Sequence, residues 1–192
     1  NHPSFLEILY ACGCLGAVFV PLNFRLTGPE IIFIANDADI TVMFADNMLQ
    51  PLIEEEKANL NCARYLTIQN DADGWDALEP LMVGADPIIA SEHVGADEIA
   101  FIMYTSGTTG LPKGAMLTHG NVFWNSINVC FGEDTMTTTT LTCAPLFHIG
   151  GLNVTTLLSL AKGIEVVLLR SFDAGAVLAL IEKHKVGSMF GA

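Results

Sequence analysis

Tyr104-Thr-Ser-Gly-Thr-Thr-Gly-Leu-Pro-Lys-Gly114 is the stretch that organises the rest of the chain. It follows the apolar run Ile99-Ala-Phe-Ile-Met103, which predicts a buried strand. The glycines of this stretch allow positive φ angles and a close approach of a ligand to the backbone. Hydroxyl groups, backbone N–H groups and the ammonium group of Lys113 are donors that together bind phosphate. The stretch therefore predicts a phosphate-binding loop directly after a strand.

The loop differs from the common nucleotide loop, whose pattern is Gly-x-x-x-x-Gly-Lys-Ser/Thr. Counted from Gly107, Pro112 stands in the place of the second glycine, and Gly114 stands in the place of the metal-binding hydroxyl. A Ser/Thr/Gly cluster is also typical of an ordinary surface linker. The apolar strand before the cluster and the Lys-Gly pair after it favour the phosphate loop.

Length and composition predict one globular unit. The 192 residues are 51% hydrophobic with a mean hydropathy of +0.46, which is enough for one sizeable core. The longest apolar stretch, from Ile8 to Leu22, contains glycines and is shorter than the roughly 20 residues of a spanning helix. Five cysteines without metal-ligand spacing fit a reducing compartment. We expect no signal peptide, no transmembrane segment and a cytoplasmic location.

The chain is strongly acidic. Eight Lys and Arg residues stand against 21 Asp and Glu residues, which gives a net charge of -13. This charge argues against nucleic acid and anionic membrane surfaces as partners, and a phosphate ligand would need local donors and a divalent metal. Between Arg64 and Lys113 no Lys or Arg occurs, so we expect residues 71–98 to form a solvated, loop-rich connection.

Apolar runs alternate between helical and extended patterns along the chain, as in a parallel sheet covered by helices. Expected helices cover 4–16, 27–36, 47–57, 121–131, 152–161 and 173–185, and expected strands cover 17–21, 41–45, 64–68, 99–103, 115–118, 141–144, 165–169 and 187–190. Capping boxes at Ser4 and Thr27 begin the first two helices. The first helix is apolar nearly all round, which predicts burial. Trp124, Ile127 and Phe131 share one helical face, which predicts a core face.

Three separated stretches resemble the adenylate-forming enzymes, the superfamily of acyl-CoA synthetases, peptide-synthetase adenylation domains and beetle luciferases. Residues 104–114 are similar to the signature phosphate loop of these enzymes. The segment that precedes this loop in the family is similar to Gly16-Ala-Val-Phe-Val-Pro-Leu-Asn23, and their second core motif is similar to Pro145-Leu-Phe-His-Ile-Gly-Gly151. Thr118-His-Gly-Asn121 looks more like acyl-CoA synthetases than like amino-acid-activating domains. The resemblance implies an α/β fold with parallel-rich sheet layers flanked by helices, and residues 1–192 would form an incomplete N-terminal AMP-binding domain.

The resemblance also implies a two-step ligase. A carboxylate attacks the α-phosphorus of ATP to give an acyl adenylate and pyrophosphate, and the thiol of coenzyme A then displaces AMP. The residues implied to hold the β- and γ-phosphates are Thr105, Ser106, Gly107, Thr108, Thr109, Gly110 and Lys113. Thr105 is the implied Mg²⁺ ligand. His148, in the second core motif, is implied to border the acyl tunnel and to orient the carboxylate.

The family motifs that bind adenine and ribose, complete the Mg²⁺ site, form the hinge and supply the adenylation lysine are not found in this sequence. We therefore expect a fragment of a longer ligase, without the C-terminal catalytic-lysine domain and inactive alone. The apolar character of residues 119–161 and the Phe147-His148 and Gly150-Gly151 pairs favour a fatty acid over an aryl acid.

Three alternatives remain open at this point. The chain could belong to an amino-acid-activating adenylation domain, which shares the phosphate loop. It could be a P-loop NTPase, although Pro112 and Gly114 disfavour this assignment. It could also be a non-catalytic remnant that binds nucleotides or proteins, whose exposed sheet edge and cut core would favour self-association.

Overall fold

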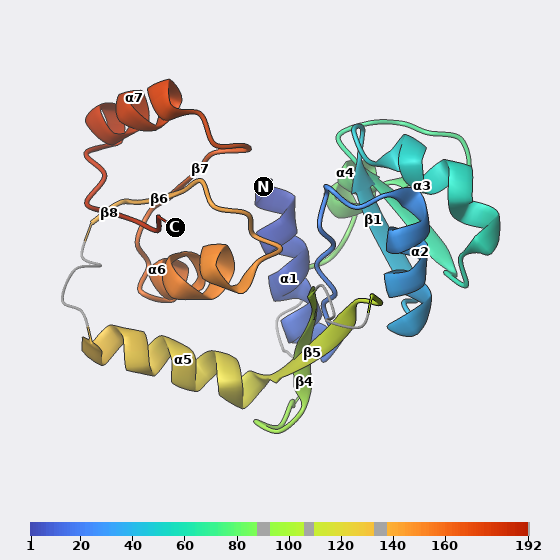
Figure 1. Cartoon of the computed structure of the whole chain (residues 1–192), viewed down its shortest axis with the longest axis horizontal. Coiled ribbons are helices and arrows are strands. Elements are labelled where there is room, and N and C mark those ends of the chain that lie inside the picture. The colour runs from blue at the N-terminus through green and yellow to red at the C-terminus, as the bar shows by residue number, and fades with distance from the viewer. Residues whose placement is uncertain (88–92, 106–109, 133–137, 192) are drawn as a thin grey trace. The chain divides into compact units, whose positions relative to one another are not determined.

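The computed structural model describes residues 1–87, 93–105, 110–132 and 138–191 (Figure 1). They form two compact units. Unit 1 is made of Asn1–Pro21, Glu92–Met103 and Met116–Ala192, and unit 2 is made of Leu22–Ser91 and Tyr104–Ala115. The expectation of one globular unit is therefore wrong, because two separate hydrophobic clusters form, one in each unit. The assignment of residues 1–192 to a single partial domain stays a prediction.

Unit 2 is built around a parallel sheet with the strand order β1-β2-β3. Its elements are α2 (Gly28–Asp37), β1 (Val42–Asp46), α3 (Gln50–Glu56), the 3₁₀-helix η1 (Lys57–Asn59), β2 (Arg64–Ile68), β3 (Asp76–Ala77) and α4 (Leu78–Val83). Strands β1 and β2 pair in register from Val42 with Arg64 to Asp46 with Ile68. The expected strands 41–45 and 64–68 are thus confirmed, and parallel pairing agrees with the alternation of helices and strands.

The start of α2 follows from its capping box. The Thr27 backbone N–H and hydroxyl both donate to Glu30 Oε2, at 2.8 and 2.7 Å. Beyond this cap, Ile31 and Ala35 are buried against β1, where Met43 is also buried. The helix is fixed by a local polar signal at its start and by an apolar face along its length.

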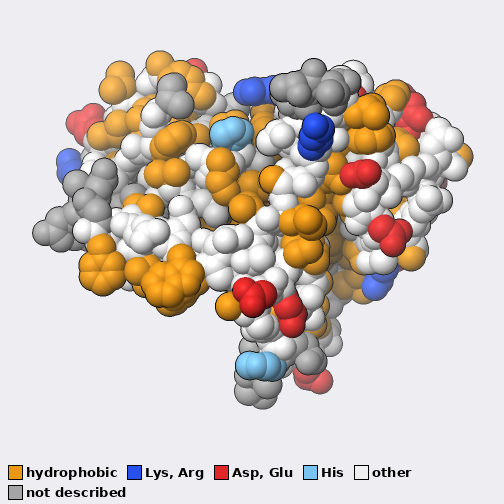
Figure 2. All heavy atoms as spheres, turned by 60° about the horizontal axis from the view of Figure 1, so that its bottom comes forward, with side chains coloured by type: hydrophobic (Ala, Val, Ile, Leu, Met, Phe, Trp, Pro, Cys, Tyr) orange, Lys and Arg blue, Asp and Glu red, His pale blue; other side chains and the backbone are white. Residues whose placement is uncertain are grey.

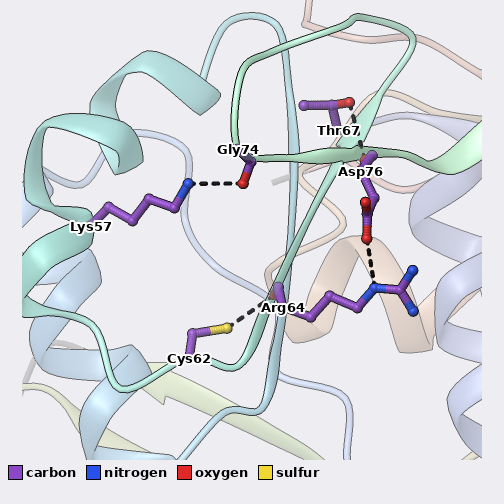
Figure 3. A network of polar contacts seen from close by, with 6 residues as sticks. All are labelled: Lys57, Cys62, Arg64, Thr67, Gly74 and Asp76. Carbon is purple, nitrogen blue, oxygen red and sulfur yellow. Dashed lines mark hydrogen bonds and ion pairs between the residues drawn. The ribbon is translucent and has the colours of Figure 1, made fainter.

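The acidic connection is more ordered than its composition predicted. Trp75 lies in the core of unit 2, and β3 and α4 follow it. Lys57 Nζ donates to the Gly74 carbonyl at 3.0 Å, and Arg64 Nε donates to Asp76 Oδ2 at 2.8 Å (Figure 3). The prediction of a loop over 71–98 is therefore wrong for residues 76–83, which form β3 and α4. Its solvated character holds for residues 71–87, of which only Trp75 is buried.

Unit 1 contains helices on either side of a second parallel sheet. Its elements are α1 (Pro3–Leu15), α5 (His119–Gly132), β6 (Thr140–Thr142), the π-helix η2 (Gly150–Thr156), α6 (Leu157–Ala161), β7 (Val166–Leu168), α7 (Ala174–His184) and β8 (Ser188–Met189). Strands β4 (Ile99–Thr105) and β5 (Lys113–Thr118) pair with each other and contribute residues to both units. Phe19, in the expected strand 17–21, makes a single parallel bridge to Phe101.

The strand order β7-β6-β8 places β6 in the centre, with parallel partners on both sides. The connection from β6 to β7 runs in one direction across the sheet, and the connection from β7 to β8 runs back past β6. Right-handed crossovers in opposite directions put their helices on opposite faces, and Figure 1 shows α6 and α7 on opposite sides of these strands. The loop after β6 therefore leaves the carboxyl end of the central strand, where ligands bind in open α/β sheets.

Two expectations about the first helix are wrong. Its N-cap is His2, whose Nδ1 accepts the Ser4 backbone N–H at 3.1 Å, because the helix already begins at Pro3. Only Ser4 and Leu9 are buried on it, and Tyr10 and Leu15 are 46% and 56% exposed. One side of α1 packs on the core, so an apolar sequence all round does not mean burial all round. Gly16 ends the helix at a φ of 67°, as expected.

The predicted core face of α5 is also wrong. Trp124 and Phe131 are 61% and 87% exposed, whereas Val122 packs against the core of unit 1. The helix carries two apolar stripes, and spacing cannot say which of them faces inward. Figure 2, which brings the side of α5 forward, shows large hydrophobic side chains on that surface. In the described parts of the chain, no helix is long and apolar enough to cross a membrane.

Candidate functional site

The ends of the candidate phosphate loop are two paired strands. Strand β4 ends at Thr105, and β5 begins at Lys113. Thr105, Gly110 and Lys113 are all exposed, and they all belong to unit 2. Ser106, Gly107, Thr108 and Thr109 lie outside the described residues. The structure thus brings one hydroxyl and one ammonium group to the two ends of the stretch that the sequence analysis selected.

Gly110 shows why this stretch needs glycine. Its φ is +98°, in the region that L side chains rarely adopt, and a Cβ at this position would meet no atom of the described residues within 4 Å. Backbone conformation, not crowding, therefore excludes other residues here. Open space beside the backbone is also what a bound phosphate requires.

Tyr104 ties the end of β4 to helix α2, a contact that sequence reasoning missed. Its Oη donates to Asp37 Oδ2 at 2.5 Å, and Asp37 is the last residue of α2. Burial of the phenol and, after it, the hydrogen bond and charge of Asp37 raise the pKa of Tyr104 to about 12. The phenol therefore stays protonated at neutral pH and remains a donor to Asp37. Position in the motif gave no signal that Tyr104 would reach a helix 67 residues earlier.

At the start of the loop, Thr105 supplies a hydroxyl, a hard-oxygen group of the kind that binds Mg²⁺. Among the residues that the structure describes, no group of three or more His, Cys, Asp or Glu side chains could hold a metal ion. The Thr105 hydroxyl is a hard oxygen at an exposed strand end. Mg²⁺ commonly takes few protein ligands and fills its remaining positions with water and substrate phosphates. Thr105 fits that role as one ligand, and the chain offers no dedicated metal cage in its described part.

His148 is an exposed residue of the turn that follows the central strand β6 of unit 1. Its backbone N–H donates to the Pro145 carbonyl at 3.2 Å, and its Nδ1 accepts the Gly150 backbone N–H at 3.2 Å. A neutral imidazole that accepts at Nδ1 carries its proton at Nε2. The exposed ring therefore presents an N–H donor, which suits a carboxylate oxygen.

The π-helix η2 begins two residues after His148 and is held by buried hydroxyl groups. Thr156 Oγ1 donates to the Gly151 carbonyl at 2.7 Å and lies 2.7 Å from Thr142 Oγ1 on β6. Gly151 is required for packing, because a Cβ there would lie 2.2 Å from the Pro145 carbonyl oxygen. Single π-turns are frequent at functional sites. The expected helix 152–161 is confirmed as a helical segment, but its first half has the wider π geometry.

A cavity of about 270 Å³ also lies within unit 1, and it does not include His148. Its lining is mainly apolar and includes Leu9, Phe101, His119, Val122, Phe123 and Leu157. Nε2 of His119 is buried without a hydrogen-bond partner among the described residues. The apolar character of residues 119–161, noted in the sequence, thus corresponds in part to a real cavity wall.

Comparison with known proteins gives consistent findings. The model of the family described as "AMP-binding enzyme" matches residues 1–192. A feruloyl-CoA synthase of Amycolatopsis sp is 43% identical over 192 residues, which are 100% of this chain and 36% of that protein. An indoleacetate–CoA ligase of Aromatoleum aromaticum is 37% identical over 188 residues, or 97% of this chain and 37% of that protein.

Among solved structures, a long-chain-fatty-acid–CoA ligase of Archaeoglobus fulgidus superposes with a TM-score of 0.86 at 26% identity. The match covers 98% of this chain and 37% of that one. The chain therefore spans little more than a third of the length of these proteins. The chain shares the fold of the N-terminal domain of adenylate-forming enzymes, and its own structure is mixed α/β with parallel strands and helices, as the sequence analysis expected.

Proposed function

Because the chain belongs to the AMP-binding enzyme family, whose model matches residues 1–192, we propose that it supplies the phosphate-binding part of an acyl-CoA ligase. In this reaction a carboxylate attacks the α-phosphorus of ATP, pyrophosphate leaves, and coenzyme A then displaces AMP from the acyl adenylate. The observation that carries the proposal is the pair of strands β4 and β5, whose exposed ends Thr105 and Lys113 enclose the glycine-rich stretch.

The residues of the loop bind and orient the phosphates that leave. Adenylyl transfer needs positioning and charge stabilisation more than covalent chemistry from the protein. Lys113 contributes a positive charge in a chain of net charge -13, and the hydroxyls and N–H groups of residues 105–110 contribute hydrogen bonds. Mg²⁺, when bound with ATP, neutralises phosphate charge, and Thr105 is its proposed protein ligand.

His148 has the second proposed role. Its Nε2–H donates to an oxygen of the substrate carboxylate, because Nδ1 is already used by the Gly150 N–H. A donor at this position orients the carboxylate without removing the electron pair that attacks phosphorus, since a hydrogen bond to one oxygen leaves the other oxygen as the nucleophile. The imidazole is therefore a proposed positioning donor and not a general base.

A fatty acid is the proposed acyl substrate. The proposal is supported by the apolar character of residues 119–161, part of which lines the cavity of unit 1. The relatives are named for feruloyl, indoleacetate and long-chain fatty acyl groups. The test is pyrophosphate exchange by the ligase that contains this chain, with a long-chain fatty acid, ferulate, indoleacetate and amino acids compared side by side. Faster exchange with ferulate or indoleacetate would remove the fatty-acid proposal, and exchange with an amino acid alone would revive the amino-acid-activating alternative.

Calorimetry with ATP and Mg²⁺ tests the phosphate site directly on residues 1–192. We expect Lys113→Ala to weaken binding by about tenfold or more, since a hydrogen bond to a charged group contributes about 1.5–3 kcal/mol. Lys183→Ala is the matched control, because it removes the same charge from the exposed side of α7 in unit 1. If both variants bind ATP equally weakly, the loss of affinity is explained by net charge alone and not by a contact of Lys113. If the wild-type chain does not bind ATP, the proposal is contradicted.

The last part of the proposal is that residues 1–192 make no acyl-CoA alone. The motifs that the family resemblance implies for adenine and ribose binding, the Mg²⁺ site, the hinge and the adenylation lysine are not found in this sequence. Incubation of the chain with ATP, Mg²⁺, coenzyme A and a fatty acid should give no acyl-CoA by mass spectrometry. Acyl-CoA formation would disprove this part, and release of orthophosphate in place of pyrophosphate would favour an NTPase.

A further inference from the structure

The side chain of Asn1 bonds to three backbone groups in two segments of unit 1, one of which leads to His148. Its Nδ2 donates to the Ala144 carbonyl at 2.9 Å and to the Leu169 carbonyl at 3.1 Å. Its Oδ1 accepts the Leu146 N–H at 2.9 Å. All of these residues belong to unit 1. One amide group thus uses both of its donor hydrogens and its acceptor on chain positions that are 143–168 residues away.

These three contacts lie at the carboxyl ends of two paired strands. Ala144 follows β6 and Leu169 follows β7, and the two strands are parallel neighbours. Leu146 lies in the turn that leads to His148 and is 1% exposed, so its N–H has no access to water. Without Asn1, the Leu146 N–H would lose its described acceptor in a place where an unsatisfied donor is costly.

The contacts continue from Leu146 to the imidazole through short local bonds. The His148 N–H donates to the carbonyl of Pro145, the residue between the two Asn1 contacts on the turn. The His148 ring then accepts the Gly150 N–H at Nδ1. The orientation of the ring, and with it the Nε2–H tautomer, therefore depends on a turn whose first half is held by Asn1.

We propose that Asn1 is a positioning residue for His148: its amide fixes the Ala144–Leu146 backbone so that the imidazole presents its Nε2–H outward. The inference rests on the proposed function only for the role of His148 in the reaction. The arrangement of contacts is a property of unit 1 by itself. A side chain that acted only as a general staple would contribute stability without affecting the His148 ring.

The chain offers a matched control in unit 2. Asn36 Nδ2 donates to the Asn59 carbonyl at 2.8 Å, and Asn36 Oδ1 accepts the Asn61 N–H at 3.1 Å. This amide performs the same kind of bridging as Asn1 but belongs to the other unit. Asn36→Ala therefore removes similar hydrogen bonds without touching the His148 turn.

The experiment is NMR on ¹⁵N-labelled residues 1–192, produced with an initiator methionine before Asn1. In Asn1→Ala we expect the Leu146 amide to exchange with solvent about tenfold faster, the change that corresponds to one lost hydrogen bond. We also expect the imidazole ¹⁵N signals of His148 to shift toward those of an unconstrained histidine side chain, because the turn that orients the ring is no longer fixed. His184 on α7 is the internal reference, and its signals should stay unchanged, as should all histidine signals in Asn36→Ala.

Asn1→Asp is a second variant that separates the accepted hydrogen bond of Asn1 from its two donated ones. It also provides a test if Asn1→Ala does not fold. It keeps an acceptor for the Leu146 N–H, so exchange of that amide should change by less than about threefold. It loses both donors, so the release of the Ala144 carbonyl should still shift the His148 ring signals. Unchanged His148 signals in the folded Asn1 variants, or equal shifts in Asn36→Ala, would overturn the inference. No nucleotide or acyl substrate is used, so this result is independent of whether residues 1–192 bind ATP.

Discussion

Substitution of Gly151 by alanine is predicted to disrupt the turn that carries His148. A Cβ at this position would lie 2.2 Å from the Pro145 carbonyl oxygen, 2.8 Å from the Pro145 carbonyl carbon and 3.0 Å from the Ala144 oxygen. All three atoms are backbone, so no side-chain rotation can relieve the contact. The same Pro145 oxygen accepts the His148 N–H. The turn must therefore move away from the start of η2.

The size of the effect follows from this geometry. The shortest contact must lengthen by about 0.8 Å, from 2.2 Å to the 3.0 Å below which real Cβ atoms essentially never lie. Overpacking in a well-packed core typically costs about 1–3 kcal/mol. Backbone displacement and the weakened His148–Pro145 hydrogen bond, worth about 1 kcal/mol, add to this cost. We expect the free energy of unfolding to fall by about 3 kcal/mol or more.

Gly150→Ala is the control at the neighbouring position. Its Cβ would meet the Phe190 ring at 2.9 and 3.1 Å, but this neighbour is a side chain that can rotate. We expect a loss of about 1 kcal/mol, at the low end for overpacking. Both variants insert the same methyl group beside the same histidine, so their difference isolates the backbone contact.

The assay is urea unfolding of residues 1–192, followed by far-UV circular dichroism. A loss of about 3 kcal/mol lowers the unfolding midpoint by at least about 1 M urea, because the urea dependence of unfolding is about 1–3 kcal/mol per molar. Gly150→Ala should lower it by less than half as much. If Gly151→Ala unfolds at the wild-type midpoint, or is no less stable than Gly150→Ala, the assigned contact between Gly151 and Pro145 is wrong.

Three further predictions concern other parts of the chain. Asp173→Ala should cost about 1 kcal/mol in urea unfolding, because Asp173 Oδ1 accepts the Ala176 N–H at 2.7 Å as the N-cap of α7, and Asp173→Asn should cost less than half of that. The pKa of Tyr104 is about 12 in the folded chain against 10.0 for a free phenol, so the folded chain favours the protonated phenol. The resulting contribution to the free energy of unfolding should be complete below pH 10 and should be lost between pH 10 and 12. Tyr104→Phe should remove this part of the pH dependence of unfolding. Lys57→Met should lower the free energy of unfolding by about 1–2 kcal/mol, since Lys57 Nζ donates to the Gly74 carbonyl and lies over the rings of Tyr65 and Trp75. Arg64→Ala should lower it by under about 0.5 kcal/mol, because the ion pair of Arg64 with Asp76 is exposed.

Local signals in the sequence predicted much of the fold. The Thr27 and Glu30 pair marked the start of α2, Asp173 marked the start of α7, and the strand expected over 64–68 has the bounds of β2. Each of these features depends on residues that are close in sequence, so a pattern of a few residues contains the whole cause. The candidate phosphate loop was found in the same way, because its residues are contiguous.

Features that depend on distant contacts were not predicted. The division into two units depends on which apolar faces meet, and α5 shows that two stripes of one helix compete for the core. Asn1 reaches residues 143–168 positions away, and Tyr104 reaches Asp37 across 67 positions. The sequence contains no local signal that distinguishes an asparagine or tyrosine that bridges two segments from one that faces solvent. The candidate site was therefore predicted as a set of residues, but the side chains that hold these residues were not.

The two proposed sites differ in how the protein supports them, and this difference has functional consequences. His148 follows a central strand whose Thr140 and Thr142 are 0% and 2% exposed and whose hydroxyls pair with Ser159, Ser188 and Thr156. Such a supported turn is preorganised, so substitutions around it should reduce stability and ring orientation together. Thr105 and Lys113 are exposed, so substitutions there should remove the proposed phosphate contacts without opening a core. Substitutions in the loop are thus expected to weaken phosphate binding without a change in stability. Substitutions in the His148 turn are expected to reduce stability and ring orientation together.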